Sequence, residues 1–205
     1  MLDVNKAIEA FFQQVAGGAV DIYNECSLQH ELGIFLRSVL GAGTHKVQFE
    51  RPVGFFGFSR SGFVKNEIDL SVFASDRSER VAIEVKFPRS GQYPEQMFKF
   101  CQDVVFVEQL VAAGFNAGYF VVVADDPLFF SGSQTGIYSH FRGRVPLQGT
   151  IVKPTGQRDE SVTICGSYTV EWRDAGSVRY ACVGVSPGVR SNEPLRATRG
   201  ADALG

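Results

Sequence analysis

The sequence predicts an α/β protein with a mixed central sheet, and three observations support this fold class. Residues 64–73 and 80–87 alternate apolar and polar side chains with a period of two, which is typical of β-strands. The polar residues between them, 74–79, are few enough for a hairpin loop. A helical apolar stripe follows in residues 94–113, and a nearly continuous apolar run in residues 117–124 predicts a buried strand.

Two amphipathic helices are expected before the first strand. In residues 3–15 the apolar positions share one face, with Asp3 as a candidate N-cap, and a second helix is expected at residues 20–40. Glu31 borders the apolar stripe of this second helix. A carboxylate at the edge of a core face is costly unless it is paired, so Glu31 needs either a partner or access to water.

Residues 45–53 also alternate and predict the first strand of the sheet. The glycine-rich segment 54–62 comes next and contains three phenylalanines and Arg60. Aromatic rings beside an arginine can stack on unpaired bases, and the same rings can pack in a core around a bend. Both interpretations stay open, and Arg60 is a candidate contact for a substrate.

The hairpin places two acids opposite each other. If it is symmetric about Asp76 and Arg77, Asp69 lies directly across from Glu84 on the polar face, with Cβ atoms about 5 Å apart. Like charges in this arrangement are destabilising unless a cation lies between them or they share a proton. Because Lys86 lies on the same face, the pattern predicts a divalent-metal site that acts on a phosphate. The alternative is a solvated strand face with incidental charges.

The loop and helix after the hairpin add polar residues near the acid pair. Arg89 in the loop is a candidate phosphate contact. Gln96, Lys99 and Asp103 form a polar line beside the buried stripe of the helix. A solvated helix face with a Lys99–Asp103 ion pair would explain this line without any function.

The C-terminal part of the chain predicts irregular and then β structure. Residues 128–148 are aromatic and basic, which suits either a loop that contacts substrate or packing on the sheet. Strands are expected at residues 150–153, 161–173 and 177–185.

These elements divide the chain into three expected parts. Residues 1–148 form the α/β core with its N-terminal helix, and residues 149–185 form a small β extension packed on that core. From residue 186 to 205 the sequence is rich in Pro, Gly, Arg and Ala without periodicity, which predicts a flexible tail.

The composition indicates an ordinary globular protein, with 205 residues, 44% hydrophobic and 20% charged. No apolar run reaches the roughly 18 residues that a membrane span requires, and the N-terminus lacks the features of a signal peptide. The four cysteines form no CxxC pair, which argues against a zinc site and a disulfide framework. We therefore expect a cytoplasmic protein. Its net charge of −2 gives no overall argument for nucleic-acid binding.

Asp69, followed after a hairpin-length gap by Glu84, Val85 and Lys86, resembles the D…ExK core of the PD-(D/E)xK nuclease superfamily. The resemblance covers roughly residues 20 to 124, where the expected elements match the αβββαβ core of the restriction-endonuclease-like fold. Ile68 stands where the family name has proline, at a position that varies widely in the family. The implied fold is a restriction-endonuclease-like core with a mixed sheet, extended by the small C-terminal β section.

The resemblance implies a divalent-metal-dependent nuclease that hydrolyses phosphodiester bonds, with DNA as the expected substrate. Mg²⁺ or Mn²⁺ is the implied cofactor, held by Asp69, Glu84 and the Val85 carbonyl. Lys86 would orient a water molecule or neutralise charge on the phosphate. Glu31 on the preceding helix would complete the site.

The resemblance also names Gln96 and Lys99, because in this family the helix beside the active site adds polar residues from its early turns. Nucleic acid is the expected partner, no membrane is expected, and a homodimer is compatible because cutting both strands needs two sites. Two other classes stay open. One is a non-catalytic nucleic-acid- or protein-binding module that keeps the nuclease fold, and the other is a protein-interaction partner that uses the β extension.

Overall fold

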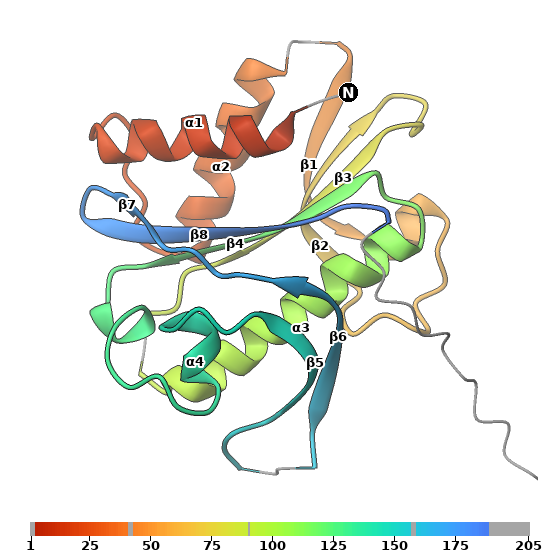
Figure 1. Ribbon diagram of the computed structural model, residues 1–205. Coiled ribbons are helices and arrows are strands. Elements are labelled where there is room, and N and C mark those ends of the chain that lie inside the picture. Colours follow the sequence, from red (N-terminus) through yellow and green to blue (C-terminus); the bar gives the residue numbers. More distant parts are fainter. Residues whose placement is uncertain (1–2, 41–42, 90, 157–158, 189–205) are drawn as a thin grey trace, which may run out of the picture.

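The computed structural model describes residues 3–40, 43–89, 91–156 and 159–188. At the centre of the protein is a six-stranded mixed sheet with the order β1-β2-β3-β4-β8-β7 (Figure 1). Strands β3 and β4 run parallel to each other, and the other neighbouring strands are antiparallel. The strands are β1 (His45–Pro52), β2 (Glu67–Ala74), β3 (Arg80–Lys86), β4 (Ala117–Ala124), β7 (Arg173–Ala175) and β8 (Val178–Val185).

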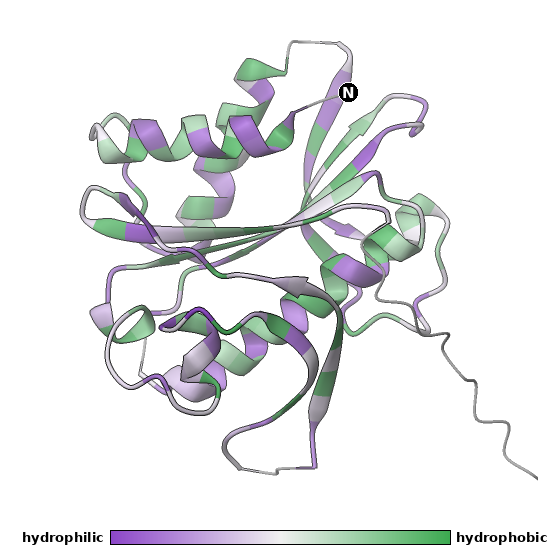
Figure 2. Ribbon diagram, viewed as in Figure 1, coloured by the Kyte–Doolittle hydropathy of each residue, from purple (hydrophilic) through white to green (hydrophobic). Residues whose placement is uncertain are grey.

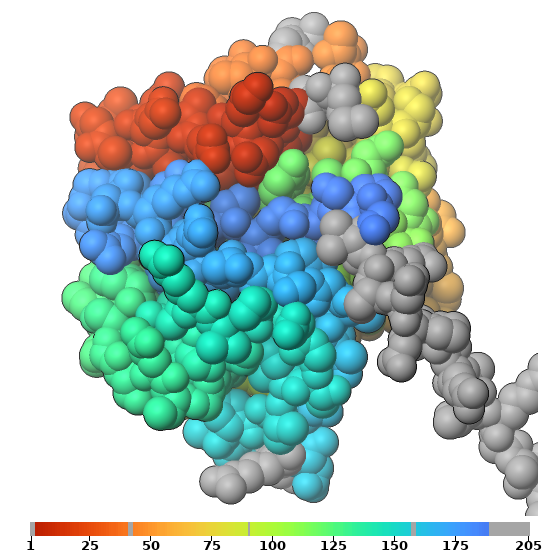
Figure 3. Space-filling view, in the orientation of Figure 1, coloured from red at the N-terminus to blue at the C-terminus, as the bar shows by residue number. Residues whose placement is uncertain are grey.

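Both faces of this sheet are covered, which gives the protein three layers. Helices α1 (Val4–Ala16) and α2 (Glu25–Val39) pack on one face. Helix α3 (Tyr93–Ala112) packs on the other face with α4 (Tyr138–Phe141) and a two-stranded sheet of β5 (Leu147–Val152) and β6 (Ser161–Tyr168). The space-filling view shows α1 against β7 and β8, with the segment that contains α4, β5 and β6 on the opposite side (Figure 3). The predicted α/β class is confirmed.

Each face of the sheet buries its own hydrophobic core, and hydrophobic residues recur along the central strands (Figure 2). Leu70 and Ile83 belong to the core beneath α1 and α2. Phe120 and Val122 belong to the core beneath α3. Burial of one such side chain contributes about 1.5–3 kcal/mol relative to exposure. The two cores therefore hold the central strands firmly in place.

Helix α2 begins later than the pattern predicted. The expected range was residues 20–40, but the helix starts at Glu25. Asn24 is the reason, because its side chain accepts a hydrogen bond from the Ser27 N–H at 2.7 Å while the Ser27 hydroxyl accepts one from the Asn24 N–H at 3.0 Å. This reciprocal capping box fixes the first turn and excludes the preceding residues from the helix.

The predicted register of the β2–β3 hairpin is confirmed. Leu70 pairs with Ile83 and Ser71 pairs with Ala82, as symmetry about Asp76 and Arg77 requires. The polar face of the hairpin is not solvated, however, because α3 packs on it. Ser71, Ala82 and Glu84 are all fully buried. The charges on this face therefore need a structural or chemical explanation.

The glycine-rich segment after β1 packs in the core. Phe56 is buried, and Phe55 and Phe58 pack against the cluster beneath α3. The rings of Phe56 and Phe115 meet edge to face with centroids 5.0 Å apart. This geometry supports the packing interpretation of these phenylalanines.

Residues 149–185, expected as one added β section, divide between two sheets. The expected strand 161–173 ends at Tyr168, and its last residue begins β7 in the central sheet. Between them Val170 is buried, and the Trp172 indole N–H donates to the Phe141 carbonyl at 2.8 Å. Strand β8 then pairs with β4 in the central sheet. The part of the expected tail from residue 189 onward lies outside the described residues.

Two global expectations concern membranes and cysteines. None of the helices in the described part of the chain has the length and apolar character needed to cross a bilayer. Cys26, Cys101 and Cys182 form no disulfide within the described part of the chain.

Candidate functional site

The candidate site lies where β2 and β3 stop pairing through their backbones. Beyond the Leu70–Ile83 pair, side chains take over the hydrogen bonds. The Asp69 N–H donates to Glu84 Oε1 at 3.1 Å, and the Val85 N–H donates to Asp69 Oδ2 at 2.9 Å. The two acids that the hairpin register brings together are thus held next to each other, each by a backbone N–H of the neighbouring strand.

Lys65, in the loop before β2, places its ammonium group among three carboxylates. Its Nζ donates to Glu84 Oε2 and, at 3.0 Å, to Asp103 Oδ1, and it lies 3.9 Å from Asp69 Oδ1. The Glu84 side chain is fully buried and that of Asp103 is 4% exposed. The polar face of the hairpin is therefore the floor of a buried charge cluster.

Asp103 is the contribution of α3 to this cluster, and the sequence argument missed its role. It lies three residues after Phe100 and four before Val107, both fully buried, so helical spacing places it on the buried stripe. That spacing was the available signal. Asp103 Oδ2 is buried without a hydrogen-bond partner, which leaves one acceptor of the cluster unsatisfied.

Lys86 lies at the edge of the cluster and is held from both sides. Its Nζ donates to Glu25 Oε1 and to the Val85 carbonyl, both at 3.0 Å, and lies 3.9 Å from Asp103 Oδ2. Glu25 is the first residue of α2, so the capping box that starts this helix also positions the partner of Lys86. Glu25 was not among the site residues predicted from the sequence.

The pKa values of the cluster follow from burial and from the neighbouring charges. Burial, and then the Asp69 carboxylate, raise the pKa of Glu84 well above its ordinary value. Burial also raises the pKa of Asp103. Burial lowers the pKa of Lys65 and Lys86, but the surrounding carboxylates outweigh it and leave both values raised. Both lysines are therefore cations at neutral pH and cannot act as bases.

The charge balance of the cluster fits a divalent cation. The carboxylates of Asp69, Glu84, Asp103 and Glu25 lie around two ammonium groups, which leaves two formal negative charges when every group is ionised. Carboxylate oxygens are the ligands that Mg²⁺ and Mn²⁺ prefer. Asp103 Oδ2, which lies 3.9 Å from the Lys86 ammonium, adds an acceptor without a hydrogen bond. The residues present therefore suit such an ion.

The described residues contain no group of three or more His, Cys, Asp or Glu side chains arranged as a ready metal site. The position of Lys65 gives a physical reason. Its ammonium lies between the carboxylates of Glu84, Asp103 and Asp69 and meets their charge itself.

A groove of about 480 Å³ opens beside the cluster. Arg60 is exposed on its wall and makes no hydrogen bond or ion pair with the rest of the described chain. This groove is the open approach to Asp69, and it combines a free cation with acidic side chains. Its lining residues are Glu50, Pro52, Arg60, Lys65, Asn66, Glu67 and Asp69.

Glu50 on β1 brings a further carboxylate to this groove. Its neighbours on β1 pair with the neighbours of Asp69 on β2, so Glu50 stands opposite Asp69 in the sheet. The backbone of Glu50 has a φ of 52°, a region that side-chain-bearing residues rarely adopt. Gln29 on α2 donates to Glu50 Oε1 at 3.2 Å and to the Asp69 carbonyl at 2.8 Å. These contacts tie β1, β2 and α2 together at the edge of the groove.

Several residues named from the sequence lie apart from the cluster. Glu31 makes no hydrogen bond or ion pair with the cluster within the described chain, and it is separated from Glu25 by about 120° around α2. Arg89 pairs with Asp125 at 2.5 Å. Lys99 is exposed and Gln96 is half-buried on α3, and neither side chain bonds to the cluster in the described residues.

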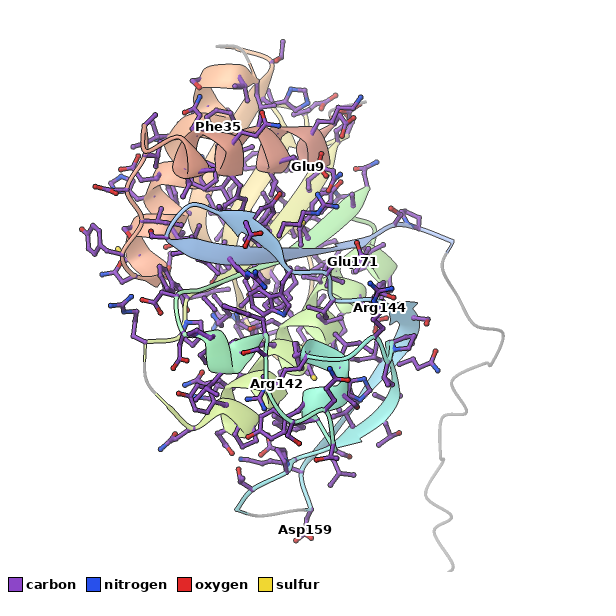
Figure 4. All side chains as sticks on the ribbon, turned by 60° about the vertical axis from the view of Figure 1, so that its left-hand side comes forward. Glu9, Phe35, Arg142, Arg144, Asp159 and Glu171 are labelled. Atoms are coloured by element: carbon purple, nitrogen blue, oxygen red, sulfur yellow. The ribbon has the colours of Figure 1, made fainter. Side chains whose placement is uncertain are left out.

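A second hollow of about 390 Å³ lies between α4 and the β6–β7 connection. Figure 4 labels Arg142, Arg144 and Glu171, which come from the two sides of this hollow. The Arg142 guanidinium donates to the carbonyls of Leu128 and Ser133. Phe129 and Phe141, from the segment that was open between substrate contact and packing, are both buried. This segment therefore packs on the sheet.

Comparison with known proteins found no family model, no curated protein and no solved structure that matches this chain. A functional assignment therefore depends on the geometry of the cluster and its groove.

Proposed function

We propose that this protein is a divalent-metal-dependent nuclease of the PD-(D/E)xK type, which hydrolyses phosphodiester bonds in DNA. The observation that supports this most is the contact of Asp69 with buried Glu84 at the point where two strands separate. A protein rarely buries two carboxylates together unless the charge has a use. Lys86 next to this pair and the groove beside it complete a site for a phosphodiester.

The metal would be held by Asp69, Glu84 and Asp103, with the Val85 carbonyl as a further oxygen donor. When bound, Mg²⁺ or Mn²⁺ supplies Lewis acidity to the phosphodiester and lowers the pKa of water. Asp103 replaces Glu31 in the set inferred from the sequence, because it shares Lys65 with Glu84 whereas Glu31 makes no bond to the cluster within the described residues.

The chain's own residues divide the remaining tasks. Lys86 keeps its positive charge, and its hydrogen bond to Glu25 holds it at the edge of the cluster. It would therefore neutralise the charge that develops on the phosphate during attack. Arg60 on the groove wall is free to pair with a neighbouring phosphate of the strand. Arg89 is held by Asp125 and is available only if that ion pair opens.

Cleavage assays test this function directly. Plasmid, linear duplex DNA, single-stranded DNA and RNA are incubated with Mg²⁺ or Mn²⁺, beside the variants Lys86→Ala and Lys99→Ala. We expect cleavage of DNA by the wild type and by Lys99→Ala, in which only an exposed lysine outside the cluster is removed. Cleavage should be absent in Lys86→Ala and in the presence of EDTA. Cleavage that survives in Lys86→Ala would refute the assignment.

A non-catalytic binding module is the second candidate, and one observation favours it. Lys65 already neutralises part of the carboxylate charge, so the cluster can serve to fasten α3 to the sheet without any metal. Such a module would bind an oligonucleotide equally well with Mn²⁺ and with EDTA, and it would cut none of the four substrates.

A further inference from the structure

Lys65 and a divalent cation would compete for the same three carboxylates. The ammonium of Lys65 contacts Glu84 Oε2 and Asp103 Oδ1 and lies 3.9 Å from Asp69 Oδ1. These three side chains are the proposed metal ligands, so this inference depends on the proposed function. An ammonium group and a divalent cation held by the same three carboxylates repel each other strongly in a site with little water.

Among the described residues, Lys86 makes no hydrogen bond to the three carboxylates, and its one hydrogen bond to a proposed metal ligand goes to the Val85 carbonyl, which has a second lone pair. Its hydrogen bonds go to Glu25 and to the Val85 carbonyl, and its distance to Asp103 Oδ2 is 3.9 Å. It can therefore keep its position when a cation binds to Asp69 and Glu84. The two lysines of the cluster differ in this respect, because Lys65 lies among the ligands and Lys86 lies beside them.

The groove can accept the Lys65 side chain when its ammonium leaves the carboxylates. It lies in the irregular loop between η1 (Val53–Phe56) and β2, and its side chain is 29% exposed. It also lines the groove that contains Arg60. Rotation of its flexible four-carbon stem would bring its ammonium into the groove without a change in the sheet. There it would join Arg60 opposite the acidic side chains of Glu50 and Glu67.

We propose that Lys65 is an exchangeable cation of this site, which holds the three carboxylates together until a divalent metal displaces it into the groove, where it binds a phosphate of the nucleic-acid strand. Metal loading and substrate binding are then coupled through one side chain. The metal neutralises the carboxylates, and the released ammonium adds a positive charge to the groove at the same time.

Calorimetric titration with Mn²⁺ tests the exchange. Lys65→Met removes the competing charge and keeps an unbranched side chain, so it should bind Mn²⁺ at least tenfold more tightly than the wild type. Lys65→Arg keeps the charge and can hold the carboxylates through two N–H groups, so it should bind Mn²⁺ at least threefold more weakly. Lys99→Met is the matched control. It removes one exposed lysine that has no bond to the cluster, and its affinity should equal that of the wild type.

Equal or weaker Mn²⁺ binding by Lys65→Met, with the wild type still cutting DNA, would overturn the exchange and leave the proposed function standing. Absence of Mn²⁺ binding in the wild type and in both Lys65 variants would overturn both proposals. Lys65→Arg keeps the test decisive if Lys65→Met fails to fold, because affinity equal to that of the wild type would contradict the exchange.

The second part of the proposal concerns the strand. With Ca²⁺ in place of Mn²⁺ to prevent cleavage, a labelled single-stranded DNA oligonucleotide should bind Lys65→Met at least threefold more weakly than the wild type. In EDTA the two proteins should bind it equally, because Lys65 then remains on the carboxylates. An equal affinity in Ca²⁺ would refute the role of Lys65 at the phosphate.

Discussion

Helix α3 has two acids that meet different surroundings, Glu108 against the small sheet and Asp103 against the charge cluster of the central sheet. Glu108 accepts hydrogen bonds from the Cys165 N–H at 2.9 Å, from the Gly166 N–H at 2.6 Å and from the Tyr168 hydroxyl at 2.9 Å. Asp103 is more deeply buried, meets two ammonium groups, and has one oxygen without a hydrogen bond.

Under the proposed function, the difference separates a structural carboxylate from one that would bind the metal. The donors around Glu108 are neutral groups of β6, so this residue fastens the small sheet to α3 and has its hydrogen bonds satisfied. Asp103 faces the ammonium groups of Lys65 and Lys86, and its Oδ2 accepts no hydrogen bond from the described chain. A buried carboxylate with spare capacity next to a groove is the kind of group that can take a metal.

The largest expected effect is on DNA cleavage, which should depend on the charge cluster and not on Glu108. Glu84→Gln keeps the size of the side chain but removes the buried charge next to Asp69, so DNA cleavage should fall at least about 100-fold. Glu108→Gln is the matched substitution at the carboxylate that contacts β6, and it should keep the activity of the wild type. Rates of plasmid nicking measure both, and equal losses in the two variants would show that the cluster has no special role.

Stability should show the opposite order, with a larger loss in Glu108→Gln than in Glu84→Gln. Glu108→Gln replaces a charged acceptor of several hydrogen bonds with an amide, and one NH₂ group then faces its former donors. The free energy of unfolding should fall by about 1.5–3 kcal/mol, as urea denaturation would measure. Mn²⁺ affinity should not change. An unaltered urea midpoint would show that Glu108 does not fasten β6 to α3.

The pH dependence of the metal-free protein sharpens the comparison further. Because the pKa of Glu84 is raised in the folded state above its ordinary 4.5, the folded protein binds this proton more tightly than the unfolded chain. Stability is therefore greatest below that value and is lost as the pH rises through the raised pKa. In EDTA, Glu84→Gln should lose less stability than the wild type as the pH is increased from 4.5. Identical slopes would contradict the raised pKa.

The smallest effect concerns the start of α2, which presents Glu25 to Lys86. Asn24→Ala removes a side-chain cap and should cost about 1 kcal/mol of stability, with a partial loss of cleavage because Glu25 loses its fixed position. Asp3→Ala removes the corresponding cap of α1, where the side chain accepts from the Lys6 N–H at 3.1 Å. This control should lose similar stability without losing activity, and a parallel loss of activity would contradict the role of Glu25.

The local parts of the fold and site could be predicted from sequence. The side chains of a strand alternate with a period of two, and the short loop fixes the hairpin register, so the meeting of Asp69 and Glu84 followed from the chain alone.

The remaining parts depend on tertiary packing. Period two could not show that α3 would cover the polar face, so Asp103 looked like a surface partner of Lys99 instead of a partner of Lys65. The helix predicted from residue 20 obscured the cap at Asn24, and with it the role of Glu25. The separation of β6 from β7 likewise depends on which sheet each strand joins.

The central claim is that Asp69 and Glu84 form a metal site, and thermal unfolding with and without Mn²⁺ tests it most directly. The account predicts that Mn²⁺ raises the unfolding midpoint of the wild type, because the ion binds only the folded protein, and that the increase disappears in Asp69→Ala. An equal increase in both proteins, or none in the wild type, would contradict it.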